Sequence, residues 1–214
     1  MSKKIYLFSL VLLALTFTAC SETEETGRYD NWRARSEAFI DSIANVYAGQ
    51  QNGSITVTDE KERLYPFTDL TNGQTIYAKK RISRDGVKDD DKPVYTSKVS
   101  AYYRMSYFNG DVVQQNFAGT EPDEFDVPSE FLLNEVISGW GYTLTEMAEG
   151  EFWTLYIPYQ SGYGSGTGSD GSLQAYSALV YDVKQIQINM PKRLKRNIAD
   201  TSMGIPFPVS VLNT

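Results

Sequence analysis

Few of the side chains that usually carry covalent catalysis are present in this chain. Its 214 residues contain no histidine and a single cysteine, Cys20. Serine–histidine and cysteine–histidine catalysis are therefore excluded, as are most zinc sites, because they need an imidazole or several thiolates. One cysteine also excludes an intramolecular disulfide. Any chemistry of the folded part must proceed without imidazole or thiol groups.

Two short motifs could suggest a cofactor, and neither has the context it needs. Gly166 to Gly171 matches G-x-G-x-x-G, but a dinucleotide loop must open a helix, whereas the following LQAYSALVYDV has the composition of a strand. Asp170 within the loop would also repel phosphate. The run Asp89 to Asp91 lacks calcium-loop spacing and is typical of a solvated turn. We expect no metal or other cofactor.

Charge and carboxylate placement exclude two further function classes. The formal net charge is −7, whereas nucleic-acid binding needs a basic surface. Nothing in the sequence pairs two carboxylates at the spacing that a glycosidase requires. We therefore expect neither a nucleic-acid partner nor glycoside hydrolysis.

The most distinctive cluster is apolar and aromatic. In the stretch NEVISGWGYTLTEM, residues 134–147, Val136 and Ile137 precede Trp140 by a few positions. A tryptophan directly after Val-Ile-x-Gly offers a large flat apolar surface. Such a group serves binding rather than proton transfer.

The elements that must position this cluster begin with a helix. Apolar residues at helical spacing predict it from about Asn31 to Ala48. Asp30 or Asn31 can cap its start, and Gly49 can end it. Its apolar face either packs against the main domain or binds a partner. The face consists of Trp32, Phe39, Ile40, Ile43, Val46 and Tyr47.

From Ile55 onward the composition favours strands. Five segments rich in Tyr, Val and Ile show partial alternation, and Asn109-Gly110 is a hairpin dipeptide. A helical signal between strands is confined to residues 138–147. The pattern predicts an α+β fold, a mostly antiparallel sheet with one short helix and an added N-terminal helix. The strand segments are SITVT (54–58), TIYAKKRIS (75–83), VSAYYRMSYF (99–108), FWTLYIPY (152–159) and ALVYDVKQIQI (178–188).

Spacings across residues 75–188 resemble those of the FKBP-type peptidyl-prolyl isomerases. The family pattern runs Val-Ile-x-Gly-Trp, then Met, Gly, Ile-Pro, Tyr-Gly and a strand of the type Leu-x-Phe-x-Val. Upstream, Tyr103 precedes the turn glycine Gly110 by seven residues, as in the family. The matches are Val136, Ile137, Gly139, Trp140, Met147, Gly150, Ile157, Pro158, Tyr163, Gly164, Leu179, Tyr181 and Val183. The resemblance implies an antiparallel, half-open sheet wrapped around a short helix, with a proline-binding pocket between them.

The resemblance also implies roles for nine residues. Trp140 would be the floor on which a proline ring lands, and Val136 and Ile137 would be one wall. The Ile137 backbone N–H would donate to a substrate carbonyl. The remaining positions are lining residues, with Leu173 on a flap after the Gly-rich loop: Tyr103, Val113, Gln114, Tyr163, Leu173 and Tyr181.

Three positions depart from the family pattern. Gln114 stands where the family usually has Asp, so hydrogen bonding is kept and the charge is lost. A wall position that is normally aromatic falls at Val127 by counting, with Phe125 as a substitute. The flap has QAYS, residues 174–177, in place of Pro-Pro. These departures concern the catalytic rate more than the fold.

The N-terminus has the pattern of an export signal. Lys3 and Lys4 precede an apolar stretch from Ile5 to Phe17, and FTAC resembles a bacterial lipobox. That resemblance implies cleavage before Cys20 and a lipid on its sulfur. An ordinary cleavage site near Cys20 is the alternative. Acidic residues after the cysteine resemble those of Bacteroidetes surface lipoproteins, or form a plain solvated spacer.

These observations give an expected layout and three candidate functions. The layout is a signal peptide (1–19), an acidic tether (20–28), an N-terminal helical extension (29–72), the isomerase domain (73–190) and a C-terminal tail (191–214). The first function is a prolyl isomerase of the cell envelope, anchored in the outer membrane through the lipid on Cys20, that acts on X-Pro segments of exported proteins. The others are a non-catalytic peptide- or partner-binding lipoprotein on the same fold, and a glycan-binding surface lipoprotein.

Overall fold

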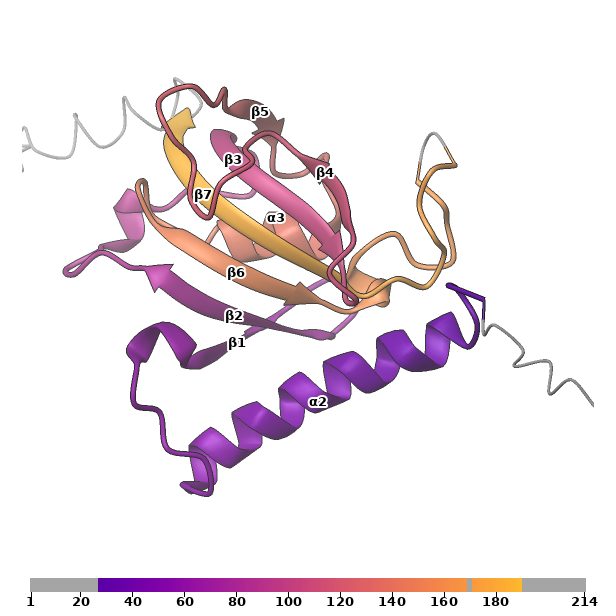
Figure 1. Cartoon of the computed structure of the whole chain (residues 1–214). Coiled ribbons are helices and arrows are strands. Elements are labelled where there is room, and N and C mark those ends of the chain that lie inside the picture. The colour runs from indigo at the N-terminus through magenta and orange to yellow at the C-terminus, as the bar shows by residue number, and fades with distance from the viewer. Residues whose placement is uncertain (1–26, 169–170, 190–214) are drawn as a thin grey trace, which may run out of the picture. The chain divides into compact units, whose positions relative to one another are not determined.

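The computed structural model describes residues 27–168 and 171–189 (Figure 1). The expectations for the signal peptide, Cys20, the tether up to residue 26, Asp170 and the tail lie outside these residues. The chain divides into two compact units, residues 1–30 and 31–214, and every element below belongs to the second. The helices are α2 (Trp32–Asn52) and α3 (Ser138–Leu144), with short 3₁₀ turns η2 (Glu60–Glu62), η3 (Asp89–Asp91) and η4 (Tyr159–Ser161).

Seven strands form one antiparallel sheet. The spatial order is β1-β2-β6-β7-β3-β4, and β5 pairs with the other half of the same β3 edge. Each pair is antiparallel. The strands are β1 (Leu64–Thr68), β2 (Thr75–Ile82), β3 (Lys98–Tyr107), β4 (Val112–Gln115), β5 (Ser129–Leu132), β6 (Phe152–Ile157) and β7 (Leu179–Asn189).

The two faces of the sheet carry different helices, as the pleat dictates. Trp153, Leu155 and Ile157 alternate along β6 and are fully buried on the face that α3 covers. Register places Tyr181 of β7 beside Leu155 on this face. The opposite face carries Tyr156, which α2 covers. Figure 1 shows α3 enclosed by the curled sheet and α2 outside it.

Helix α2 packs through rings near both ends. Phe39 lies 5.9 Å from the Phe108 ring and 6.1 Å from Tyr156, and Tyr47 lies 5.5 Å from Tyr77. The apolar stripe therefore packs on the main domain, as the first of the two interpretations held, although Val46 remains 37% exposed. No helix within 27–168 and 171–189 combines the length and apolarity needed to cross a bilayer.

The fold class and most elements match the sequence-based expectation, with four corrections. SITVT is not a strand; Ile55 instead folds back so that its N–H donates to the Gly49 carbonyl at 2.9 Å. Helix α2 continues past Gly49 and ends at Gly53, which has φ 78°. Asn31 is the N-cap residue but makes no side-chain capping bond. The range 29–72 contains β1, the edge strand of the sheet, as well as α2.

Candidate active site

Helix α3 is anchored at its first residue by a buried carboxylate. Ser138 Oγ donates to Asp69 Oδ2 at 2.5 Å, and the Thr71 N–H and Oγ1 donate to Oδ1 at 2.9 and 2.6 Å. Burial alone would raise the pKa of Asp69, but the hydrogen bonds from Ser138 and Thr71 outweigh it and hold that pKa below its ordinary value. The β1–β2 turn thus fixes where α3 begins.

Two glycines let α3 approach its neighbours closely. A Cβ at Gly139 would lie 2.9 Å from the Ser161 carbonyl oxygen, and one at Gly141 would lie 2.4 Å from that of Leu133. Neither distance is tolerated by a real side chain. These glycines flank Trp140, so the position of the indole depends on their lack of side chains.

Trp140 lies at the base of a cavity and is ringed by aromatic side chains. Its ring centroid is 4.8 Å from Phe131, 5.9 Å from Tyr181 and 6.4 Å from Tyr103. Phe131 and Tyr103 meet it nearly edge-on, at 78° and 67°. Only 3% of Trp140 is exposed, yet it lines a cavity of about 260 Å³. The small exposed part of the indole therefore forms an apolar surface of the cavity, and three aromatic rings surround it.

The structure brings most of the predicted site residues to this cavity. Besides Trp140, its lining contains Val136 and Ile137, which directly precede α3, and Gln114 from β4. The described residues of the lining are Tyr103, Gln114, Phe131, Glu135, Val136, Ile137, Trp140, Tyr163 and Tyr181.

Val113 and Leu173 line a second cavity, of about 240 Å³. Gln114 and Tyr163 take part in both linings, so the two cavities adjoin. Leu173 is buried, with 8% of it exposed, while Tyr163 is 38% exposed. All nine predicted positions therefore lie along one connected recess.

The hydroxyls of Tyr181 and Tyr103 stay protonated well beyond neutral pH. Burial raises the pKa of Tyr181 well above its ordinary value, and nearby Tyr163 adds to the effect. Burial also raises the pKa of Tyr103. The Tyr181 hydroxyl contacts Met105 Sδ at 2.8 Å, a weak acceptor. These hydroxyls are neutral donors, suited to hydrogen bonding and unsuited to acting as bases.

A backbone donor faces the same region. Ile137 is the N-cap of α3, with φ −56° and ψ 140°, and its carbonyl accepts from the Trp140 and Gly141 N–H groups. Among the described residues, nothing accepts a hydrogen bond from the Ile137 N–H. A half-buried free N–H beside an apolar floor can bind a carbonyl oxygen.

In the cavity lined by Trp140, two lining residues were not predicted from the sequence, Phe131 and Glu135. The aromatic wall is Phe131, whereas Phe125 and Val127 are 85% and 73% exposed and lie outside both linings. The alternation of SEFL, with Phe131 half-buried on β5, is the signal that would have found it. Glu135 was also missed, and among the described residues it is the one charged side chain in either lining.

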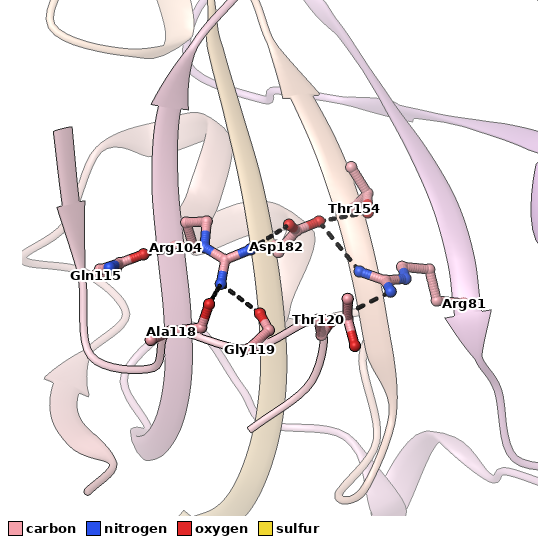
Figure 2. A network of polar contacts seen from close by, with 8 residues as sticks. All are labelled: Arg81, Arg104, Gln115, Ala118, Gly119, Thr120, Thr154 and Asp182. Atoms are coloured by element: carbon pink, nitrogen blue, oxygen red, sulfur yellow. Dashed lines mark hydrogen bonds and ion pairs between the residues drawn. The ribbon is translucent and has the colours of Figure 1, made fainter. Parts of the chain in front are cut away.

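The wall formed by β4 is supported from behind by a polar network (Figure 2). Asp182, which follows the cavity residue Tyr181 on β7, accepts from Thr154 Oγ1 at 2.6 Å and lies 3.7 and 3.9 Å from Arg81 and Arg104. Arg104 donates to Gln115 Oε1 at 3.0 Å and to the carbonyl oxygens of Ala118, at 2.8 Å, and Gly119.

Arg81 extends this anchoring by donating to the Thr120 carbonyl at 3.3 Å. The segment after β4 is therefore bonded to β2 and β3, and Asp182 connects both arginines to β7. Because Val113 and Gln114 precede this segment directly, the network limits how far their wall can move.

A resident metal ion is not indicated for this recess. Across the described residues, no group of three or more His, Cys, Asp or Glu side chains is arranged to hold one. The donor set of the recess, phenols, one amide and one carboxylate, matches none of the common structural metal sites.

The sequence of this chain is similar to those of known peptidyl-prolyl cis-trans isomerases. Residues 89–186 match the family model described as FKBP-type peptidyl-prolyl cis-trans isomerase. The chain is 35% identical over 96 residues to the FKBP-type 22 kDa peptidyl-prolyl cis-trans isomerase of Escherichia coli, covering 45% of this chain and 43% of that protein. It is 48% identical over 61 residues to the macrophage infectivity potentiator of Trypanosoma cruzi, covering 28% of this chain and 31% of that protein.

These relatives extend beyond the matched region, since the chain spans less than half of either one. Among solved structures, a peptidyl-prolyl cis-trans isomerase from Pseudomonas syringae aligns with a TM-score of 0.47 and 24% identity, covering 72% of this chain and 96% of that one.

Proposed function

Because residues 89–186 match the family model of the FKBP-type peptidyl-prolyl cis-trans isomerases, we propose that this protein catalyses cis–trans isomerisation of X-Pro peptide bonds. The observation that carries the proposal is the indole of Trp140 at the base of a cavity of about 260 Å³, with Phe131, Tyr103 and Tyr181 around it. That recess fits one five-membered ring and the amide attached to it.

The reaction needs no nucleophile, which agrees with a chain without histidine. Rotation about the X-Pro bond must break amide resonance, with a barrier of roughly 18–20 kcal/mol. The planar amide is more polar than the twisted form, because resonance places charge on its oxygen and nitrogen. Packing of the aromatic and aliphatic side chains against the amide therefore disfavours the planar ground state relative to the twisted transition state.

Each group of the recess has a part in this scheme. The proline ring packs on the Trp140 indole, and Val136 and Ile137 close one side. The free Ile137 N–H holds a substrate carbonyl, which keeps one side of the bond fixed while the other rotates. Tyr163, more than a third exposed, offers a hydroxyl at the rim. Positioning of this kind lowers the barrier without covalent chemistry.

The arrangement of the aromatic rings around Trp140 argues against the glycan-binding alternative. Sugar sites set aromatic platforms beside carboxylates or amides on an open face. Here Trp140 is 3% exposed and three rings close around it, so the aromatic surface is a recess rather than a platform. This arrangement favours a small ring over a pyranose.

Direct measurement of peptide exchange separates an isomerase from a non-catalytic binding module. The cis–trans exchange rate of Ala-Ala-Pro-Phe would be measured by NMR with and without the protein, and its Kd by titration. We expect acceleration at catalytic protein concentrations. Binding without acceleration would contradict the proposal and favour the module. Gln114→Asp would then show whether the missing carboxylate accounts for the loss.

We further propose that the protein is anchored in the bacterial cell envelope, at the outer membrane, through a lipid on Cys20. The support is the sequence alone: a basic start, an apolar stretch and a lipobox-like FTAC before Cys20. Metabolic labelling with an alkyne fatty acid, followed by membrane fractionation, tests it. Label on the wild type and none on Cys20→Ser is expected; equal label on both would refute the anchor.

A further inference from the structure

We propose that the first two turns of α2 position the flap of the isomerase site and so hold Tyr163 and Leu173 at the recess. The flap is defined here as two arms between β6 and β7, residues 159–168 and 171–178. The kinetic part of this inference rests on the proposed function, whereas the structural part does not.

The second arm is bonded to α2 through buried polar groups. Trp32 Nε1 donates to Ser177 Oγ at 2.8 Å, and the Ala178 N–H donates to Ser36 Oγ at 2.9 Å. Trp32 is 4% exposed and Ser36 fully buried. More than 140 residues of sequence separate the partners in each bond. A buried N–H that loses its acceptor is costly, so these bonds fix the end of this arm.

One arginine of α2 holds both arms together. The Arg33 guanidinium lies 5.0 Å from the centroid of Tyr176 and 5.5 Å from that of Tyr159, and donates to the Tyr159 hydroxyl at 3.0 Å. The two tyrosine rings meet edge to face at 5.3 Å. Tyr176 has φ 59°, a left-handed conformation that is unfavourable for a bulky residue. Cation–π contact with Arg33 stabilises the strained residue in place.

Short hydrogen bonds carry this restraint to the site residues. The Tyr176 N–H donates to the carbonyl of Gly164, the residue after Tyr163, at 2.9 Å. The Leu173 N–H donates to the Thr167 carbonyl at 2.9 Å, which ties the two arms to each other. Each flap residue that contacts α2 therefore lies within five positions of Tyr163 or Leu173, which line the recess.

Tyr107 adds a second connection between α2 and the flap. Its hydroxyl accepts from the Gln174 N–H at 2.7 Å. Its ring meets the Trp32 ring edge to face at 5.3 Å. Trp32 thus supports the flap directly through Ser177 and indirectly through Tyr107.

The expected consequence is pre-organisation of the substrate site. A loose flap would have to be ordered each time a peptide binds, and that ordering would weaken binding. Because the helix supplies the order in advance, loosening it should raise KM, with a smaller effect on the rotation step itself.

The far end of α2 offers a matched control. Gln50 Oε1 accepts from the Leu64 N–H at 2.9 Å, as Ser36 Oγ accepts from the Ala178 N–H. Gln50→Ala removes the side-chain acceptor of the Leu64 N–H, and Ser36→Ala removes that of the Ala178 N–H. Only Ser36 touches the flap.

The test combines hydrogen exchange without substrate and kinetics with Ala-Ala-Pro-Phe, on the purified protein and its variants. In Ser36→Ala we expect flap amides such as those of Gly164 and Leu173 to exchange about fivefold faster or more, while β6 amides are unchanged. KM should rise roughly three- to tenfold with kcat within about twofold. Gln50→Ala should leave flap exchange and KM at wild-type values.

Arg33→Ala gives a second route, because Arg33 is exposed and its loss does not empty the core. It should loosen both arms in the same exchange measurement even if Ser36→Ala fails to fold. Wild-type flap exchange in Arg33→Ala or in a folded Ser36→Ala, or equal loosening by Gln50→Ala, would overturn the inference. Absence of wild-type isomerase activity would instead overturn the proposed function, and flap exchange would still decide the positioning claim.

Discussion

Replacing Gly141 by alanine is the sharpest packing test of how α3 positions Trp140. The added Cβ would lie 2.4 Å from the Leu133 carbonyl oxygen, whereas about 3.0 Å is the closest approach that real Cβ atoms show. Helix and strand end must therefore separate by at least about 0.6 Å. Alanine favours the helix over glycine by about 1 kcal/mol. Overpacking against backbone costs about 1–3 kcal/mol or more, so the clash outweighs the gain.

Gly141→Ala should thus lower the free energy of unfolding by roughly 1–2 kcal/mol. It should also lower kcat/KM about tenfold or more, because the indole shifts relative to Tyr181 and Tyr103. Urea unfolding and peptide exchange NMR measure the two effects. Gly49→Ala is the matched control, since its Cβ meets the flexible Ile55 side-chain tip, 2.7 Å away, rather than backbone. Wild-type stability and rate in Gly141→Ala would refute close approach as the determinant of the indole position.

Three other predictions concern charged groups around the recess. Arg104→Met, which keeps the packed stem but loses the bonds to Gln115 and Ala118, should lower unfolding free energy by about 1–3 kcal/mol and increase amide exchange in residues 116–120. Since the pKa of Asp69 is lowered by folding, its stabilisation is present above an unfolded pKa near 4 and disappears as the pH falls through the folded pKa. The stability gap between wild type and Asp69→Asn in urea melts should therefore narrow below about pH 4; a gap that widens there would contradict the assignment. Glu135 should favour a Lys-Pro over a Glu-Pro peptide about two- to fivefold in kcat/KM at low salt, and Glu135→Gln or 1 M salt should bring the ratio close to one.

The sequence was most informative where local pattern and burial agree. β2, β3, β6 and β7 were predicted because their alternation places Tyr, Val and Ile on buried faces of central strands. β1 was missed because Pro66 interrupts a short run, and an edge strand tolerates proline where a central strand does not. SITVT was wrongly predicted as a strand because nothing local shows that Ile55 packs onto Gly49.

The residues of the recess were predicted from the resemblance to the FKBP-type family. Ile137 and Trp140 lie on one short helix and its cap, and Val136 directly precedes the cap, so local geometry keeps these three residues close together. The aromatic wall position was predicted at residue 125 or 127, whereas Phe131 occupies it. The length of the segment between β4 and β5 decides which residue reaches the wall, and the sequence does not show this. The contacts of Trp32 and Arg33 with the flap join residues more than 100 apart in sequence, and no local pattern predicts such pairs.

The most direct measurement of the central claim is the peptide exchange rate with Trp140→Leu beside the wild type. Leucine keeps the site apolar but removes the flat floor, and circular dichroism would confirm that the variant is folded. We expect the wild type to accelerate exchange of Ala-Ala-Pro-Phe. In the folded variant, kcat/KM should be lower by a factor of about ten or more, which corresponds to about 1.4 kcal/mol of lost transition-state stabilisation. A folded Trp140→Leu protein with the wild-type rate would contradict the claim that the indole forms the floor of the isomerase site.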